Sequence, residues 1–342
     1  MLLVFAGAWS RVWAGSKATR WLINPVVDLL LPCGGLVWLV LTASVTIFPA
    51  FQSPTGISAQ TTALLAGALL LTDTHFGAGF IRTFRHHYNK LMWPIWGPVL
   101  LIVITAAIVG HSEAFTILAC KCYLFVVVLH YGQQSLSLLL TYARINEYSW
   151  DGKSKWLLTI LIYGVAARVL VAQLVDPSLN VNQFLGLAMP VWTPAPEWML
   201  HFCEAATTIA AVGAGAVIFK RAAVDKQRCP LPFYVLLVNV LIVFTYLGSL
   251  SGLLWMFVPA FFHGAQSVAE AIAANREKSP RNTIALLGSS FALGAAIMWI
   301  VPTWLPGLGV PPSLAYPCLV VGASFWHFYC EYSEFKINST IQ

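Results

Sequence analysis

Long apolar runs separated by short polar connections follow one another along this chain from about residue 23 to its end. Most of these runs contain the ~20 apolar residues that an α-helix needs to cross the hydrocarbon core of a bilayer. The very short connection LGSLSG, at residues 247–252, separates the seventh run from the eighth. The pattern predicts ten membrane-spanning helices, at residues 23–50, 60–84, 92–111, 114–143, 156–175, 197–219, 231–249, 251–275, 282–302 and 312–338.

Lysine and arginine are distributed unevenly over the connections between these predicted helices. The connections near 51–59, 176–196 and 303–311 contain neither residue, whereas the alternate connections, such as RTFRHHYNK, are basic. Because Lys and Arg concentrate in cytoplasmic loops, this asymmetry predicts that both termini lie in the cytoplasm. The even-numbered helices then all run from outside to inside, so residues at equivalent positions along them lie at similar depths.

The composition supports the same fold class. Of the 342 residues, 58% are hydrophobic and 9% are charged, whereas a typical soluble domain has about 25% charged residues. We therefore expect an all-α, polytopic integral membrane helix bundle in a bacterial inner membrane or its equivalent, with residues 1–342 forming a single domain. Residues 1–22 lack the basic start of a signal peptide and are predicted to form an interfacial segment. The net charge of +6 gives no indication of nucleic-acid binding.

Four of the eight histidines lie inside predicted even-numbered helices. Each is about a dozen to sixteen residues from the outer end of its helix, which at about 1.5 Å per residue puts all four in one slab of the membrane. Ionisable groups at such depth face a partner, a cavity or a metal. The histidines expected to converge are His75, His130, His263 and His327.

Polar residues accompany these histidines along the same helix faces. Gln134, Gln266 and Glu331 each follow a histidine by three or four residues, a spacing that places two side chains on one face. Imidazole binds iron, copper, nickel and zinc, and a ligating imidazole usually hydrogen-bonds a neighbouring polar group. We therefore expect a metal site with Glu331 as a further ligand. The supporting or reserve residues are Asp73, Gln134, Gln266, Glu270, His86 and His87.

Other readings of the same residues stay open. An intramembrane histidine can simply hydrogen-bond a neighbouring helix, and His86 and His87 can be interfacial residues beside basic ones. Pairs of histidines on facing helices can also hold haem for electron transfer. A structural or pigment-binding subunit of a larger membrane complex is the third possibility. Arg168, in the middle of the fifth predicted helix, is expected to pair with Glu204 or Asp73.

Short stretches resemble two known groups of membrane proteins. The contexts HFGAGF, HYGQQSL and HGAQSV resemble those of the Brp/Blh family, bacterial membrane enzymes that cleave β-carotene and hold iron with intramembrane histidines. The sequence WHFYCEYSEFK is similar to the HHYxxDxxIWK-like motif that ends a group of uncharacterised multi-pass proteins. There His327, Glu331, Phe335 and Lys336 are in register, whereas Trp326 and Glu334 depart from the motif. The first resemblance implies an iron-dependent oxygenase.

These observations lead to one functional hypothesis with two alternatives. The hypothesis is a membrane oxygenase with histidine-ligated, non-haem iron that acts on a lipophilic small molecule such as a carotenoid or lipid. The alternatives are a haem-binding electron-transfer protein and a subunit with partners in a membrane complex. Nucleotide-binding loops and the GxSxG turn of hydrolases are absent from the sequence.

The predicted orientation can be tested with a reporter fused after Gln342. Because Lys336 and the other basic connections predict a cytoplasmic C-terminus, a reporter that is active only in the cytoplasm should work there. The measurement is reporter activity in intact cells, with a periplasm-dependent reporter at the same position as the control. Activity of the periplasmic reporter alone would contradict the predicted topology.

Overall fold

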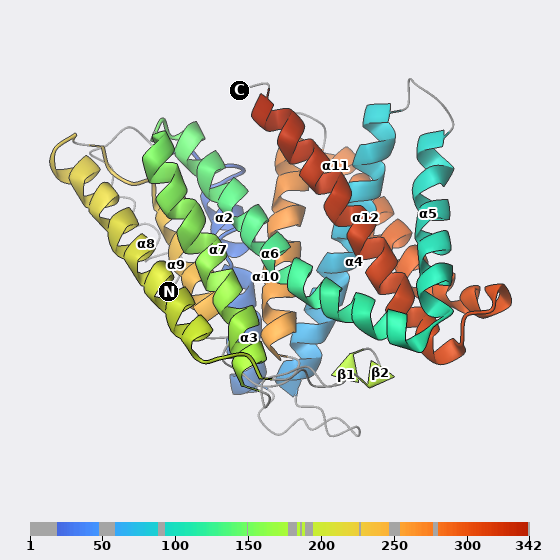
Figure 1. Ribbon diagram of the computed structural model, residues 1–342. Coiled ribbons are helices and arrows are strands. Elements are labelled where there is room, and N and C mark those ends of the chain that lie inside the picture. Colours follow the sequence, from blue (N-terminus) through green and yellow to red (C-terminus); the bar gives the residue numbers. More distant parts are fainter. Residues whose placement is uncertain are drawn as a thin grey trace.

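The protein folds into a bundle of helices (Figure 1). The computed structural model describes residues 19–47, 59–87, 93–148, 150–176, 183–184, 187–188, 194–225, 227–245, 254–275 and 280–340. Within these ranges there are eleven α-helices and a two-stranded hairpin of β1 (Gln183–Phe184) and β2 (Leu187–Ala188). The helices are α2 (Pro25–Leu30), α3 (Gly35–Ile47), α4 (Ala59–His87), α5 (Trp93–Gly110), α6 (Glu113–Ile145), α7 (Gly152–Val175), α8 (Trp198–Ala223), α9 (Leu231–Thr245), α10 (Leu254–Ala274), α11 (Pro280–Ala295) and α12 (Pro312–Thr340).

The all-α class is confirmed, and each of the ten predicted segments contains a helix. Four helical segments are long and apolar enough to cross a membrane, namely Glu113–Ile145, Gly152–Val175, Trp198–Ala223 and Arg281–Thr303. The number ten for membrane crossings therefore stays a prediction. The predicted interfacial segment falls mostly at residues 1–18, outside the described part of the chain, and the whole of LGSLSG also lies outside it.

The first predicted helix is broken into α2 and α3, because the sequence between them does not suit a continuous helix. The side chain of Asn24 accepts a hydrogen bond from the amide of Val27 at 3.0 Å, which caps the start of α2. Gly34 has a φ of +83°, a left-handed conformation that favours glycine. The chain therefore turns between α2 and α3 before it continues as a thirteen-residue helix.

A buried carboxylate ties the start of the described chain to α6. Asp28 is fully buried and accepts hydrogen bonds from the amides of Leu22 and Ile23, at 2.6 and 3.0 Å. The Tyr142 hydroxyl donates a further hydrogen bond to Asp28, at 2.9 Å. Since a buried charge needs such partners, the segment before α2 is held against α6 by this cluster.

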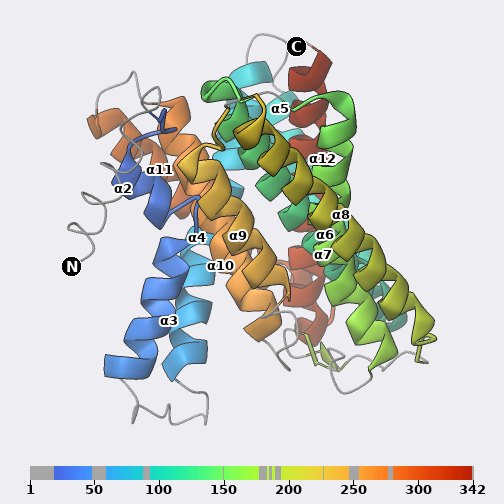
Figure 2. The ribbon, with the colours of Figure 1, turned by 90° about the vertical axis from the view of Figure 1, so that its left-hand side faces the viewer.

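The helices at the edge of the bundle present apolar side chains to the surroundings. Helix α8 packs along α7 on one side (Figure 2), while Ile209, Val212 and Phe219 on α8 are 70%, 69% and 73% exposed. An exposed apolar stripe of this kind is expected of a helix that faces lipid. The C-terminal ends of α6, α8 and α12 lie at the same end of the bundle (Figure 1), as the predicted topology requires.

Helix α4 lies at the centre of the packing because glycines let its neighbours approach closely. A Cβ atom on Gly77 would lie 1.7 Å from the backbone oxygen of Ser290 in α11. In return, a Cβ atom on Gly294 of α11 would lie 1.8 Å from the backbone oxygen of Asp73. On the α10 side, a Cβ atom on Gly264 would lie 2.6 Å from Cβ of Leu71. Small residues at helix crossings are typical of membrane bundles.

The α4–α11 crossing predicts a large effect for one methyl group. Replacing Gly294 with Ala should force the two backbones apart and lower the free energy of unfolding by about 1–3 kcal/mol or more, the usual cost of overpacking. The matched control is Gly288→Ala in the same helix, because a Cβ atom there meets nothing within 4 Å. The two variants should be compared by thermal unfolding in detergent; equal melting temperatures would contradict the tight crossing.

Candidate metal centre

Four helices bring one histidine each to a common point in the interior. His75 of α4, His130 of α6, His263 of α10 and His327 of α12 are between 2% and 6% exposed. One ring nitrogen from each lies within 4.8 Å of those of the other three. The predicted convergence of these histidines is confirmed, and within the described residues they form a group that could hold a metal ion.

The imidazole rings contact one another edge to face. Nε2 of His327 lies 2.6 Å from Nε2 of His75, and these two rings are 4.3 Å apart at their centroids. The centroid of His263 lies 4.6 Å from that of His75 and 4.8 Å from that of His130. Each of these three pairs meets at an angle between 66° and 89°, so the rings do not stack in parallel.

Aromatic side chains and the glycine backbone of α4 at Gly79 lie beside the histidines. Phe76 lies 4.7 Å from His327 and Phe328 lies 4.4 Å from His130, measured between ring centroids. A Cβ atom on Gly79 would lie only 3.2 Å from Nδ1 of His327, so the glycine allows this ring to lie directly against α4. The rings therefore lie in apolar surroundings in which an imidazole has few ways to rotate away.

A layer of amides and hydroxyls joins α6 to α10 beside the histidines. Nε2 of Gln134 donates to the Ser267 hydroxyl at 2.7 Å, and this hydroxyl donates to the backbone oxygen of His263 at 3.1 Å. The adjacent residues Gln266 and Ser135 form a second contact between the two helices, at 3.4 Å. The two glutamines were expected to support the imidazole rings directly, but these hydrogen bonds fix the helices that carry the rings.

The remaining predicted site residues fall into two groups. Asp73 is buried and accepts a hydrogen bond from Nε1 of Trp299 at 3.1 Å, and Glu270 is half-buried on α10. Helix α12 continues through Glu331 and Glu334, and α4 through His86 and His87. The side chains of Glu331, Glu334, His86 and His87 lie outside the described part of the structure.

Arg168 pairs with Glu204, as one of the sequence alternatives expected. Its Nε and Nη2 atoms both lie 3.0 Å from Oε1 of Glu204, so the ion pair joins α7 to α8. His201 lies on the same helix as Glu204 with its side chain 67% exposed. The ion pair stabilises the packing of α8 on α7. Neither Arg168 nor His201 belongs to the four-histidine group.

The spacing of the four nitrogens suits a single ion. Two imidazole ligands at about 2.0–2.1 Å on opposite sides of a metal lie about 4 Å apart, within the 4.8 Å found here. Nδ1 of His263 is buried and has no hydrogen-bond partner among the described residues. A haem fits less well, because a macrocycle would have to lie between axial ligands whose nitrogens are already as close as 2.6 Å.

Some residues around the centre were not singled out from the sequence. Tyr131 directly follows His130, and its ring lies 4.6 Å from that of His263. Phe328 similarly follows His327, and Gly79 lies one turn beyond His75. Their closeness in sequence to a predicted ligand was the available indication that these residues belong to the site. It could not identify them, because successive residues in a helix point about 100° apart, and the packing decides which of them faces the site.

Comparisons of this chain with protein-family models, with curated proteins and with solved structures find no match. What the centre does must therefore be inferred from its own geometry and chemistry.

The hydrogen bond between Gln134 and Ser267 leads to a prediction about stability. Ser267→Ala should leave the buried amide of Gln134 without this partner and cost about 1–3 kcal/mol. Gln134→Leu removes the amide, so the double variant should lose less stability than the two single variants added together. Chemical unfolding of the four proteins in detergent gives this coupling energy, and strictly additive losses would contradict the hydrogen bond.

Proposed function

We propose that the protein is an integral-membrane, metal-dependent oxygenase that acts on a lipophilic small molecule. The observation that carries the proposal is the convergence of four buried imidazoles, from four different helices, within 4.8 Å. Histidine is seldom buried in such numbers without a function, because each ring brings polar nitrogens into an apolar interior. A bound ion would satisfy those nitrogens together, with His75, His130, His263 and His327 as ligands.

The donor set fits iron, and the resemblance of the histidine contexts to the Brp/Blh family favours iron over zinc, copper and nickel. Imidazole suits zinc, copper, iron and nickel, whereas magnesium, calcium and manganese prefer oxygen ligands. Bound iron would supply the activation of dioxygen. The four histidines would hold the ion, the α6–α10 hydrogen bonds would fix the directions of His130 and His263, and the surrounding aromatic rings would exclude water.

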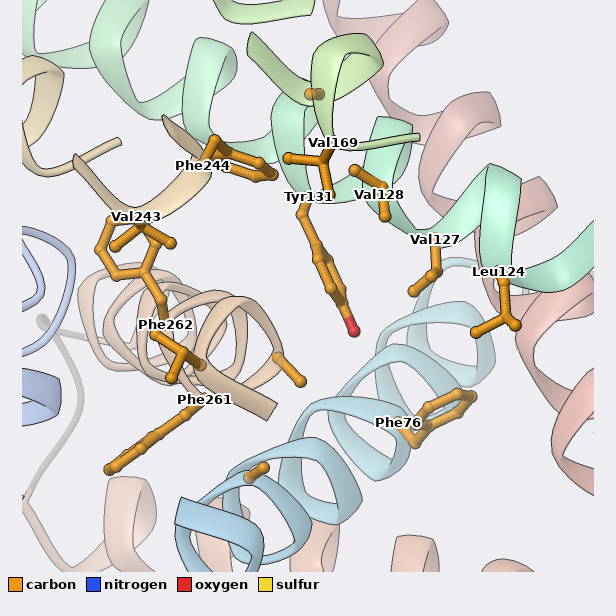
Figure 3. Packing of buried hydrophobic residues seen from close by; sticks show 14 of the residues in the cluster. Phe76, Leu124, Val127, Val128, Tyr131, Val169, Val243, Phe244, Phe261 and Phe262 are labelled. Atoms are coloured by element: carbon orange, nitrogen blue, oxygen red, sulfur yellow. The ribbon is translucent and has the colours of Figure 1, made fainter. Parts of the chain in front are cut away.

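The surroundings of the centre favour an apolar substrate. Phe76, Phe328 and Leu124 are apolar side chains of the helices that carry the histidines, and Figure 3 shows Phe76 and Leu124 among the packed residues near Tyr131. With ten membrane crossings and cytoplasmic termini, such a molecule would enter sideways from the bilayer. The resemblance of the histidine contexts to the Brp/Blh family supports a carotenoid or another long lipid.

Glu331 completes the proposed site. It follows His327 by four residues on α12, so the helix brings both to the same face. A carboxylate there would ligate the ion or accept a hydrogen bond from a ligating imidazole. Glu334 lies almost one turn further along, and we assign it no part in holding the metal.

The ligand set predicts how metal content should respond to substitution. Alanine at any of the four histidines should weaken metal binding by at least the ~10- to 100-fold that loss of a ligand's supporting partner costs, and Glu331→Gln should weaken it by about this factor. The measurement is elemental analysis of gently purified protein, with thermal stability recorded in parallel. The variants are His75→Ala, His130→Ala, His263→Ala, His327→Ala and Glu331→Gln.

Two controls separate ligation from structure. His201→Ala removes an exposed histidine of α8, and Glu334→Gln removes a carboxylate beyond the proposed ligands; both should keep the full metal content. If His327 only hydrogen-bonds His75, its alanine variant should be less stable but leave the metal content unchanged. That result would end the oxygenase proposal and favour a structural role for the histidines.

A further inference from the structure

Tyr131 brings a phenol to the histidine cluster from α6. Its side chain is buried, at 7% exposure, and its ring lies 4.6 Å from the ring of His263 at an angle of 37°. Figure 3 shows the ring extending from α6 with its hydroxyl pointing into the region between α4 and α10. These are the helices that carry His75 and His263, so the hydroxyl points toward the centre and not toward the surface of the bundle.

The hydroxyls of two other tyrosines on α6 have hydrogen-bond partners within the chain, whereas that of Tyr131 has none among the described residues. Tyr142 donates to Asp28 at 2.9 Å, and Tyr123 hydrogen-bonds Ser324. The interactions of Tyr131 within the described part of the chain are ring contacts with His130 and His263, without a hydrogen bond of the hydroxyl. The Tyr131 residue as a whole is buried, and a tyrosine hydroxyl in such surroundings usually has a hydrogen-bond partner.

Figure 3 labels apolar residues of this region, among them Phe76 and Val127 near the end of the Tyr131 ring that carries the hydroxyl. Neither side chain has an oxygen or nitrogen that could accept a hydrogen bond from the phenol. Phenylalanine would fill nearly the same volume at this position without burying a hydroxyl. The oxygen is therefore best explained by a group that is not part of the chain.

We infer that Tyr131 donates a hydrogen bond to a small exogenous ligand, of the size and polarity of dioxygen or azide, bound beside His263 at the metal centre. The inference rests on the proposed function, since the ligand needs a metal to bind to. The four histidines hold the ion, and the phenol recognises what occupies its remaining position. An apolar wall with one donor would favour a small anion or a polarised diatomic molecule over a larger polar ligand.

The test uses the full-length protein in detergent, loaded with Co²⁺ and titrated with azide. Azide binding is followed by visible absorption, and cobalt content and melting temperature are recorded for each protein. Tyr131→Phe should bind cobalt as the unchanged protein does, but its azide dissociation constant should rise about 10-fold, the effect of losing one hydrogen bond to a charged group. Its melting temperature should be unchanged or slightly higher, because no hydrogen bond within the chain is lost.

The controls are Tyr123→Phe and Tyr142→Phe, which remove hydroxyls of the same helix that already have partners. Both should lower the melting temperature and leave azide affinity unchanged. Tyr131→Leu is a second variant that also lacks the donor, and it should show the same loss of azide affinity if Tyr131→Phe does not fold.

Three results would overturn the inference in different ways. Unchanged azide affinity in a cobalt-loaded Tyr131→Phe protein would show that the hydroxyl does not contact the ligand, while the metal site would stand. Loss of cobalt in this variant would show that Tyr131 holds the histidines in place instead. Failure of the unchanged protein to bind cobalt would remove the proposed function itself, and the inference with it.

Discussion

The burial of four imidazoles against one another is the constraint on which the rest of this structure depends. Each ring carries two nitrogens that need hydrogen bonds or a metal, in an interior made mostly of apolar side chains. The contact of 2.6 Å between His327 and His75 shows how closely the rings must be held. Because a displacement of ~1 Å at such a site is costly, the helices that carry the rings have to be positioned with the same accuracy.

Two kinds of contact position the helices this accurately: close backbone contacts at glycines, and hydrogen bonds between polar side chains. Gly77 and Gly294 let α4 and α11 meet backbone to backbone, and Gly264 does the same for α4 and α10. Between α6 and α10 the contact is a hydrogen bond from Gln134 to Ser267. Apolar side chains alone would allow small sliding movements between helices. In a bilayer they gain little by contacting another helix instead of lipid, because both are apolar. Close backbone contacts and directional hydrogen bonds restrict both sliding and rotation.

The helices and the four histidines could be predicted from the sequence because each depends on a simple rule. Hydrophobic length located the helices, and the alternation of basic connections placed the even-numbered ones parallel, which put His75 and His327 at one depth although 252 residues separate them. The break at Gly34 was missed because the residues on both sides are apolar. The partners of Gln134 and Asp73 could not be predicted either, because they depend on how helices rotate against one another, and hydrophobic length contains no information on rotation.

The distribution of the histidines over the chain has a consequence for how the protein is made. The first lies in α4 and the last in α12, which follows the helices of the other three histidines along the chain. A ribosome must therefore have synthesised α4, α6, α10 and α12 before the fourth imidazole can meet the other three. A chain that stops after α10 would contain three of the histidines and lack His327, whose Nε2 lies 2.6 Å from Nε2 of His75. A metal held by all four histidines would thus add the stability of a cross-link among these helices only after α12 has been synthesised.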